Sequence, residues 1–160
     1  MNNSLKNNNQ GDLLGTVLEA GFFNILVGGI SLIIDIVLEI PPLPISKAHA
    51  VYLFVGLIII YSGLLVWSVV LLISAKRKNE IIKKGPYAII RHPMYAGIVL
   101  LVNPALAILF RSWSLLEASL ILYFVWKYFV RKEEKKLMEV FGDDYKKYCQ
   151  EVGCIFPKIC

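Results

Sequence analysis

The segment GPYAIIRHPMYAG, residues 85–97, carries the side chains best suited to bind a small polar ligand. Its opening Gly-Pro pair predicts a turn, and the His92-Pro93 pair predicts a helix start, because proline suits the first helical position. Tyr95 follows His92 by three positions, so we expect the phenol near the imidazole. The free N–H groups of a helix start, beside an imidazole and a phenol, can hold a carboxylate or a ribose. A helix that simply begins at a membrane surface would explain the same residues.

A second segment, RKEEKKLMEVFGDDYKKY at residues 131–148, contributes paired acids. Glu133 and Glu134 come directly after an apolar run and lie next to Arg131. Two carboxylates this close to lipid headgroups can hold an ammonium group or lie beside a sulfonium. A solvated helix face, with opposite charges paired at positions i and i+4, is the alternative interpretation.

The remainder of the chain must position these two segments, and its composition is that of a membrane protein. Of the 160 residues, 57% are hydrophobic and 18% are charged, with a mean hydropathy of +0.62. Soluble domains usually have about 45–50% apolar and about 25% charged residues. Residues 48–75 contain no Asp, Glu, Lys or Arg, and about 20 apolar residues span a bilayer. The sequence therefore predicts an all-α polytopic membrane bundle, and excludes a soluble enzyme or a disulfide-stapled secreted domain.

Four hydrophobic segments are expected to cross the membrane. The first ends at the PPLP sequence of residues 41–44, because proline cannot continue a helix. The fourth continues without a helix breaker into the polar segment with the paired acids, until Gly142, which predicts a C-cap. We expect the Asn-rich residues 1–12 to be disordered and residues 13–160 to form a single domain. The expected spans are residues 13–40, 48–75, 94–110 and 113–130.

The connection between the third and fourth spans consists only of Arg111 and Ser112, which predicts a tight antiparallel hairpin. The ends of the two spans that lie away from this connection, near His92 and Arg131, must then be neighbours. A site that combines hydrogen-bond donors with carboxylates suggests a cofactor that has both a carboxylate and cationic groups. We expect the site residues to lie at helix ends, where water can replace a lost partner.

The basic residues predict the orientation of the spans. The net charge is +5, with six Lys and Arg residues in 76–92 and seven after Val130, but only Lys47 and Arg111 in the other connections. The positive-inside rule therefore places both termini and the paired motifs in the cytosol. Basic residues beside a membrane meet anionic headgroups, so we expect membrane lipids as partners and no nucleic acid. Cys149, Cys154 and Cys160 lie in the segment placed in the cytosol, so we expect reduced thiols. They lack metal-binding spacings, so we expect no metal.

The compound pattern GPYxxxRHPMYxG, followed after one hairpin by RxEExxLxxxFGxxYxxY, resembles the integral-membrane family of isoprenylcysteine carboxyl methyltransferases and phospholipid methyltransferases. The resemblance covers residues 83–157. It implies that S-adenosylmethionine binds in a cytosol-facing pocket and that a lipid or lipidated acceptor enters from the membrane. The residues that match the first motif are Tyr87, Arg91, His92, Pro93, Tyr95 and Gly97. Those that match the second are Arg131, Glu133, Glu134, Leu137, Phe141, Gly142, Tyr145 and Tyr148.

The resemblance also implies roles for single residues. His92 and Tyr95 would contact the methyl donor. The rest of its binding site would be formed by Tyr87, Arg91, Pro93, Gly97 and Glu133. Glu134 would bind its amino group, and Arg131 would orient an anionic acceptor, because its planar fork suits a carboxylate or a phosphate. The carboxylate of a prenylated cysteine is the expected acceptor, and an aminophospholipid is an alternative. A membrane reductase that uses NADPH and a membrane scaffold without activity are the competing functions.

Overall fold

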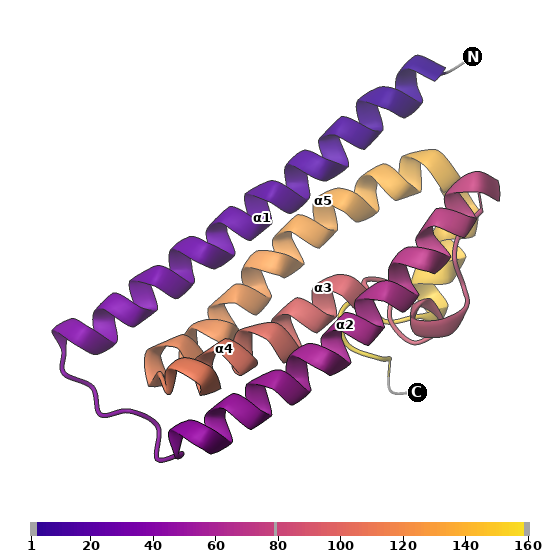
Figure 1. Ribbon diagram of the computed structural model, residues 1–160. Coiled ribbons are helices and arrows are strands. Elements are labelled where there is room, and N and C mark those ends of the chain that lie inside the picture. Colours follow the sequence, from indigo (N-terminus) through magenta and orange to yellow (C-terminus); the bar gives the residue numbers. More distant parts are fainter. Residues whose placement is uncertain (1–2, 79, 159–160) are drawn as a thin grey trace.

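The computed structural model describes residues 3–78 and 80–158, which form the helical membrane bundle expected from the sequence (Figure 1). Helix α1 packs against α5, α5 against α4, and α4 against α2. Within the described residues, four helices are long and apolar enough to cross a membrane, which confirms the predicted number of spans. The elements are α1 (Asn3–Val37), α2 (Lys47–Lys78), η1 (Gly85–Ala88), α3 (Pro93–Gly97), η2 (Ile98–Val102), α4 (Asn103–Phe110) and α5 (Trp113–Glu151).

Helix α1 differs from the expectation at both ends. It begins at Asn3, within the polar segment that was expected to be disordered, and the first two residues of that segment lie outside the described part. It ends at Val37, ahead of the prolines, because Glu39 takes a positive φ of 50° and leaves the helical conformation. The turn is closed by the N–H of Ile40, which donates to the carbonyl of Asp35 over 2.9 Å.

The third span is continuous from Pro93 to Phe110, as expected, but one turn in its middle is wider than an α-helix. The N–H of Asn103 donates to the carbonyl of Ile98, five residues earlier. Pro104 explains this turn, since it has no N–H and its ring collides with the carbonyl four positions before it. The span therefore consists of α3, the π-helical turn η2 and α4.

The connection between α4 and α5 is the tight hairpin that the sequence predicts. Arg111 closes α4 with a left-handed φ of 54°, and the Ser112 side chain accepts a hydrogen bond from Leu115 N over 2.9 Å. The Arg111 guanidinium also donates twice to the carbonyl of Leu43, at 3.1 and 3.2 Å. This contact ties the α1–α2 connection to the hairpin.

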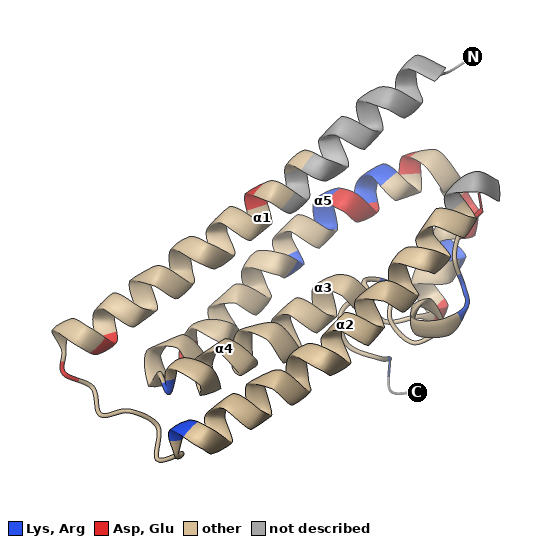
Figure 2. Ribbon diagram, in the orientation of Figure 1, with Lys and Arg blue, Asp and Glu red and all other residues tan. Residues whose placement is uncertain are grey.

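Helix α5 is longer than predicted. The chain leaves the helical conformation at Gly142, with φ 56° and ψ −130°, a combination that favours glycine. Gly142 is therefore a break, as expected, but not the end: the chain resumes a helix that continues to Glu151. Figure 2 shows most of the Lys, Arg, Asp and Glu residues at one end of the bundle, in the second half of α5 and in the connection between α2 and η1.

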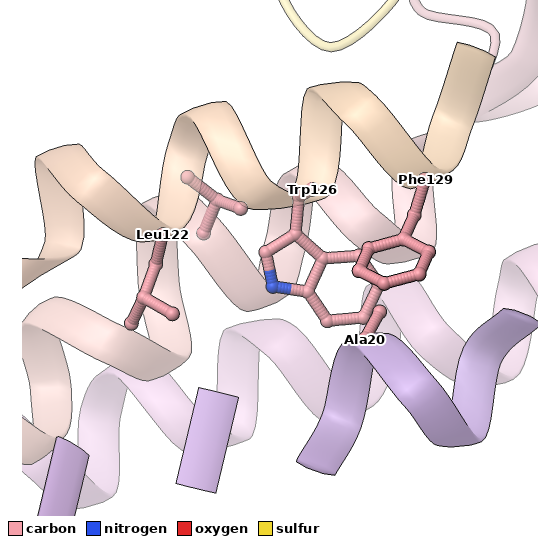
Figure 3. Packing of buried hydrophobic residues seen from close by; sticks show 5 residues of the cluster. Ala20, Leu122, Trp126 and Phe129 are labelled. Atoms are coloured by element: carbon pink, nitrogen blue, oxygen red, sulfur yellow. The ribbon is translucent and has the colours of Figure 1, made fainter. Parts of the chain in front are cut away.

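The core joins α1 to α5 through large side chains on α5. Trp126 and Phe129 are buried against Ala20 of α1, as Figure 3 shows. The Trp126 indole donates to Asn24 Oδ1 over 3.1 Å, and Asn24 and Asn103 exchange two amide hydrogen bonds of 3.1 Å. Polar groups at membrane depth need protein partners, so this network fixes how α1, α4 and α5 meet.

Candidate active site

The segment 85–92 is held against α2 and begins with a constrained turn. Gly85 has a positive φ of 58°, and a Cβ there would lie 2.9 Å from the Leu71 side chain. Gly97 also faces α2, where a Cβ would lie 2.6 Å from the Tyr61 ring. Pro93 is buried at the first position of α3, where it starts the helix. The structure thus gives Gly97 and Pro93 packing contacts that orient the rest of the motif.

The C-terminal segment after α5 forms a second wall of the site, which the sequence pattern does not predict. Ile90 pairs with Gly153 as neighbouring strands do. The backbone N–H of Arg91 donates to Gly153 O over 2.8 Å, and that of His92 donates to Cys154 O over 3.2 Å. A Cβ at Gly153 would overlap the carbonyl of Phe156, so only glycine fits there. No helical or strand periodicity in residues 152–158 indicates this pairing.

Arg91 connects three parts of the chain at this place. Its Nε donates to Glu134 Oε1 over 2.8 Å, and its Nη2 lies 2.6 Å from the same oxygen. Its Nη1 donates to the carbonyls of Cys149 and Val152. The Arg91 and Glu134 side chains are only 9% and 14% exposed. The guanidinium therefore ties α5 and the C-terminal segment to the first motif.

His92 lies against both acids of α5, which confirms that the ends of the hairpin meet. Its Nδ1 lies 3.8 Å from Glu133 Oε2, and its Nε2 lies 3.4 Å from Glu134 Oε1. The second contact does not have hydrogen-bond geometry, so the buried Nε2 has no hydrogen-bond partner among the described residues. The imidazole stacks on Tyr95 with ring centres 5.6 Å apart, and Tyr95 packs on Trp126 at 5.1 Å.

Tyr87 supplies a second unsatisfied group. Its ring is buried, its backbone carbonyl accepts a hydrogen bond of 2.6 Å from Tyr148, and its hydroxyl has no partner in the described chain. Burial, together with the negative charge of Glu133, raises the pKa of Tyr87 to about 12. The hydroxyl therefore remains protonated at neutral pH and can donate a hydrogen bond to a ligand.

The residues Tyr87, Arg91, His92, Tyr95, Glu133 and Glu134 form one cluster. The other residues of the two motifs lie outside it. Arg131 is exposed on α5 and makes no hydrogen bond or ion pair with Glu134 or any other described residue. The aromatic residues around Gly142 pack the two parts of α5 together and support the C-terminal segment. The residues in this packing are Leu137, Phe141, Tyr145 and Tyr148, with Cys149 and Val152.

A cavity of about 300 Å³ adjoins the cluster, and Arg91 forms part of its wall. It lies between α5 and the C-terminal segment. Its remaining walls are formed by Tyr123, Lys127, Cys149, Gly153, Cys154, Ile155, Phe156 and Lys158. The cavity thus combines cationic and aromatic side chains, and Glu134 contacts Arg91 in its wall, an arrangement that can bind a polar ligand.

His92, Glu134 and Cys154 place a nitrogen, an oxygen and a sulfur within 4.8 Å of one another. Such a mixed set of ligand atoms suits a transition metal. However, the Arg91 guanidinium already occupies Glu134, and its positive charge opposes a cation at the same oxygen. Cys149 and Cys154 form no disulfide among the described residues, and Cys160 lies outside them.

Comparison with known proteins finds relatives of this chain by sequence. The chain is 32% identical over 93 residues to a protein-S-isoprenylcysteine O-methyltransferase of Schizosaccharomyces pombe, and 30% identical over 101 residues to the Saccharomyces cerevisiae protein of that name. Each alignment covers 55% of this chain and 38% of the relative. A methanethiol S-methyltransferase of Pseudomonas deceptionensis is 32% identical over 75 residues, which cover 46% of this chain and 27% of that protein.

The chain thus spans less than half the length of these relatives. No solved structure matches it. The model of the isoprenylcysteine carboxyl methyltransferase family matches residues 50–139, which is more than half of the chain and includes the first motif and the paired acids. The chain therefore belongs to the isoprenylcysteine carboxyl methyltransferase family.

Proposed function

We propose that this protein is a membrane methyltransferase that transfers a methyl group from S-adenosylmethionine to a lipid-borne acceptor. Members of its family use S-adenosylmethionine. The observation that carries the proposal is the meeting of His92 with Glu133 and Glu134 beside the cavity next to Arg91. The family match favours this function over the reductase and the scaffold.

The free polar atoms of the site fit this methyl donor, which has an ammonium group, a carboxylate, a sulfonium and ribose hydroxyls. His92 Nε2 and the Tyr87 hydroxyl are buried without a hydrogen-bond partner in the described chain. An unsatisfied buried polar group costs roughly 1–3 kcal/mol, so a ligand that pairs with both atoms recovers that free energy. These atoms would hold polar groups of the methyl donor.

The two acids have different surroundings, and this changes the role expected for Glu134. Glu134 is paired with Arg91, so it already has a positive partner. Glu133 also contacts His92, but it forms no ion pair with Arg91 in the described chain and lies beside the Tyr95 hydroxyl. We assign the ammonium group of the methyl donor to Glu133, and give Glu134 the role of holding Arg91 and His92 in place.

Catalysis on this arrangement is mainly positioning and exclusion of water. When bound, S-adenosylmethionine supplies an electrophilic methyl group: the acceptor atom forms the new bond to carbon while the carbon–sulfur electron pair returns to sulfur. The stacked rings of His92, Tyr95 and Trp126 form a rigid wall that would fix the ligand and keep water away. A carboxylate acceptor is nucleophilic at neutral pH and needs no base, whereas an amine or a thiol must first lose a proton.

We propose the carboxylate of a prenylated cysteine as the acceptor, in keeping with the two yeast relatives. The Pseudomonas relative makes a small thiol a second candidate. The test is incubation of the purified protein with radiolabelled S-adenosylmethionine and total membranes. A base-labile label indicates a methyl ester, whereas a base-stable label indicates transfer to nitrogen or sulfur. Binding of NADPH without binding of S-adenosylmethionine would contradict the proposal.

A further inference from the structure

The cavity next to Arg91 has a marked excess of positive charge. Three cationic side chains of the described chain line it, those of Arg91, Lys127 and Lys158, and no described Asp or Glu is among its lining residues. Arg91 is neutralised by Glu134, whereas among the described residues Lys158 donates only to the uncharged carbonyls of Cys149 and Gln150. Two positive charges at the cavity therefore have no negative partner within the described chain.

Lys127 is the more unusual of these two residues because it lies within the apolar run of α5. It precedes Val130, the last residue of that run, by three positions, and its side chain is half-buried. Its ammonium group lies over the Tyr123 ring, 5.6 Å from the ring centre, and forms no ion pair with any described residue. A charged residue in a membrane-spanning segment is costly unless it has a partner, and by default it marks a functional site.

We propose that Lys127, with Lys158, binds the anionic headgroup of the acceptor lipid, a carboxylate or a phosphate. This inference rests on the proposed function, which requires an acceptor to meet the methyl donor at the same cavity. Arg91 contacts Glu134 in the cluster proposed to bind the methyl donor, and it also lines the cavity. The methyl donor and the acceptor would therefore lie side by side. The apolar tail would remain among the lipid-facing side chains of α5, which include the exposed Phe124 and Leu120.

The placement of Lys127 also reassigns the role expected for Arg131. Both residues are on α5, one helical turn apart, but only Lys127 lines the cavity. Arg131 is exposed, at the level where it can reach lipid phosphates. The acceptor anion is therefore bound by the residue one turn closer to the membrane centre.

The test measures binding rather than turnover, on the full chain in nanodiscs of phosphatidylcholine with S-adenosylhomocysteine present. The probes are S-farnesylated N-acetylcysteine, its neutral carboxamide, and phosphatidic acid. The variants are Lys127→Gln, Lys127→Arg and, as a matched control, Lys135→Gln, the same change at an exposed position of the same helix. Thermal unfolding and the affinity for S-adenosylmethionine are measured for each variant.

We expect the wild type to bind at least one of the two anionic probes about tenfold or more tightly than the carboxamide, the factor that a charge-assisted hydrogen bond supplies. Lys127→Gln should abolish this preference, Lys127→Arg should retain most of it, and Lys135→Gln should not change it. The anionic probe that shows the preference identifies the source, a prenylcysteine carboxylate or a lipid phosphate.

Three results would overturn the inference: no preference in the wild type, an equal loss in Lys127→Gln and Lys135→Gln, or a comparable loss of S-adenosylmethionine affinity in Lys127→Gln. The last result would assign Lys127 to the carboxylate of the methyl donor. A wild type that prefers the anion but does not bind S-adenosylmethionine would instead refute the proposed function and leave the anion subsite intact.

Discussion

Glu133 and Glu134 are neighbours on one helix, yet replacing each with glutamine should damage different properties. In Glu134→Gln the amide oxygen can still accept from Arg91, but the charge that balances the guanidinium is lost. The two side chains are 9% and 14% exposed, so water cannot fully replace that charge. This differs from the sequence-based expectation that solvent would compensate at a helix end. In Glu133→Gln, by contrast, the Arg91 contacts remain.

The expected magnitudes follow from these contacts. A hydrogen bond to a charged group contributes about 1.5–3 kcal/mol, and we expect Glu134→Gln to lose about this much free energy of unfolding. Complete removal of one partner of a buried ion pair costs more, about 3–5 kcal/mol. Glu133→Gln should lose less than about 1 kcal/mol of stability, but its affinity for S-adenosylmethionine should fall about 10- to 100-fold, since the lost bond would be to the ligand.

Thermal unfolding, hydrogen exchange and calorimetric titration separate the two effects. In Glu134→Gln the backbone N–H groups of residues 91 and 92, which donate to Gly153 and Cys154, should exchange faster. In Glu133→Gln that exchange should remain at the level of the wild type. Equal losses of affinity and of stability in both variants would refute the division of roles between the two acids.

Four further predictions concern other positions. Arg131→Lys should keep turnover in a methyl-transfer assay within about twofold of the wild type, because the exposed guanidinium has no described partner to lose. This is well under the tenfold change that 1.4 kcal/mol represents, and a larger drop would restore the role of Arg131 at the acceptor. Gly97→Ala should lower the free energy of unfolding by about 1–3 kcal/mol, because its Cβ would lie 2.6 Å from the Tyr61 ring, and Tyr61→Ala in the same chain should recover part of the loss in a denaturation experiment. Burial and the charge of Glu134 raise the pKa of Cys154 to about 11, so the thiol is neutral below that pH; its maleimide labelling rate should rise about tenfold per pH unit from pH 7 to 9, and a plateau near pH 8.5 would contradict this assignment. A membrane-impermeant maleimide added to intact cells should label a cysteine placed at Pro44 but not Cys154, and external labelling of Cys154 would reverse the orientation of the bundle.

The sequence predicts the meeting of the two motifs because a short connection leaves few possible geometries. With only Arg111 and Ser112 between two spans, the helices must run antiparallel, and His92 must approach the acids of α5. The partner of each acid could not be predicted in this way. Glu133 and Glu134 differ by one position, and their directions depend on the rotation of α5, which the burial of Trp126 and Val130 sets.

The part played by the C-terminal segment was unpredictable for a different reason. Residues 152–155 reach the site because Gly142 bends α5 and the packing of Tyr145 and Tyr148 directs the chain back. Both depend on backbone angles and on contacts between residues distant in sequence, which hydrophobic periodicity does not report. The glycines at positions 142 and 153 were the only hint in the sequence. Gly142 is needed for its positive φ and Gly153 for the close carbonyl of Phe156, and neither can be recognised before the fold is known.

The pairing of Ile90 and Arg91 with Gly153 has a consequence for how the protein is made. All four spans precede Gly153 in the chain, so they are synthesised and can enter the membrane before one wall of the site exists. Arg91 and Glu134 can pair at that stage, but the carbonyl of Val152 reaches Arg91, and that of Cys154 reaches His92, only after these later residues have been synthesised. Insertion into the bilayer and completion of the ligand site are therefore separate events in time, and a nascent chain arrested before residue 152 would be embedded yet unable to close its pocket.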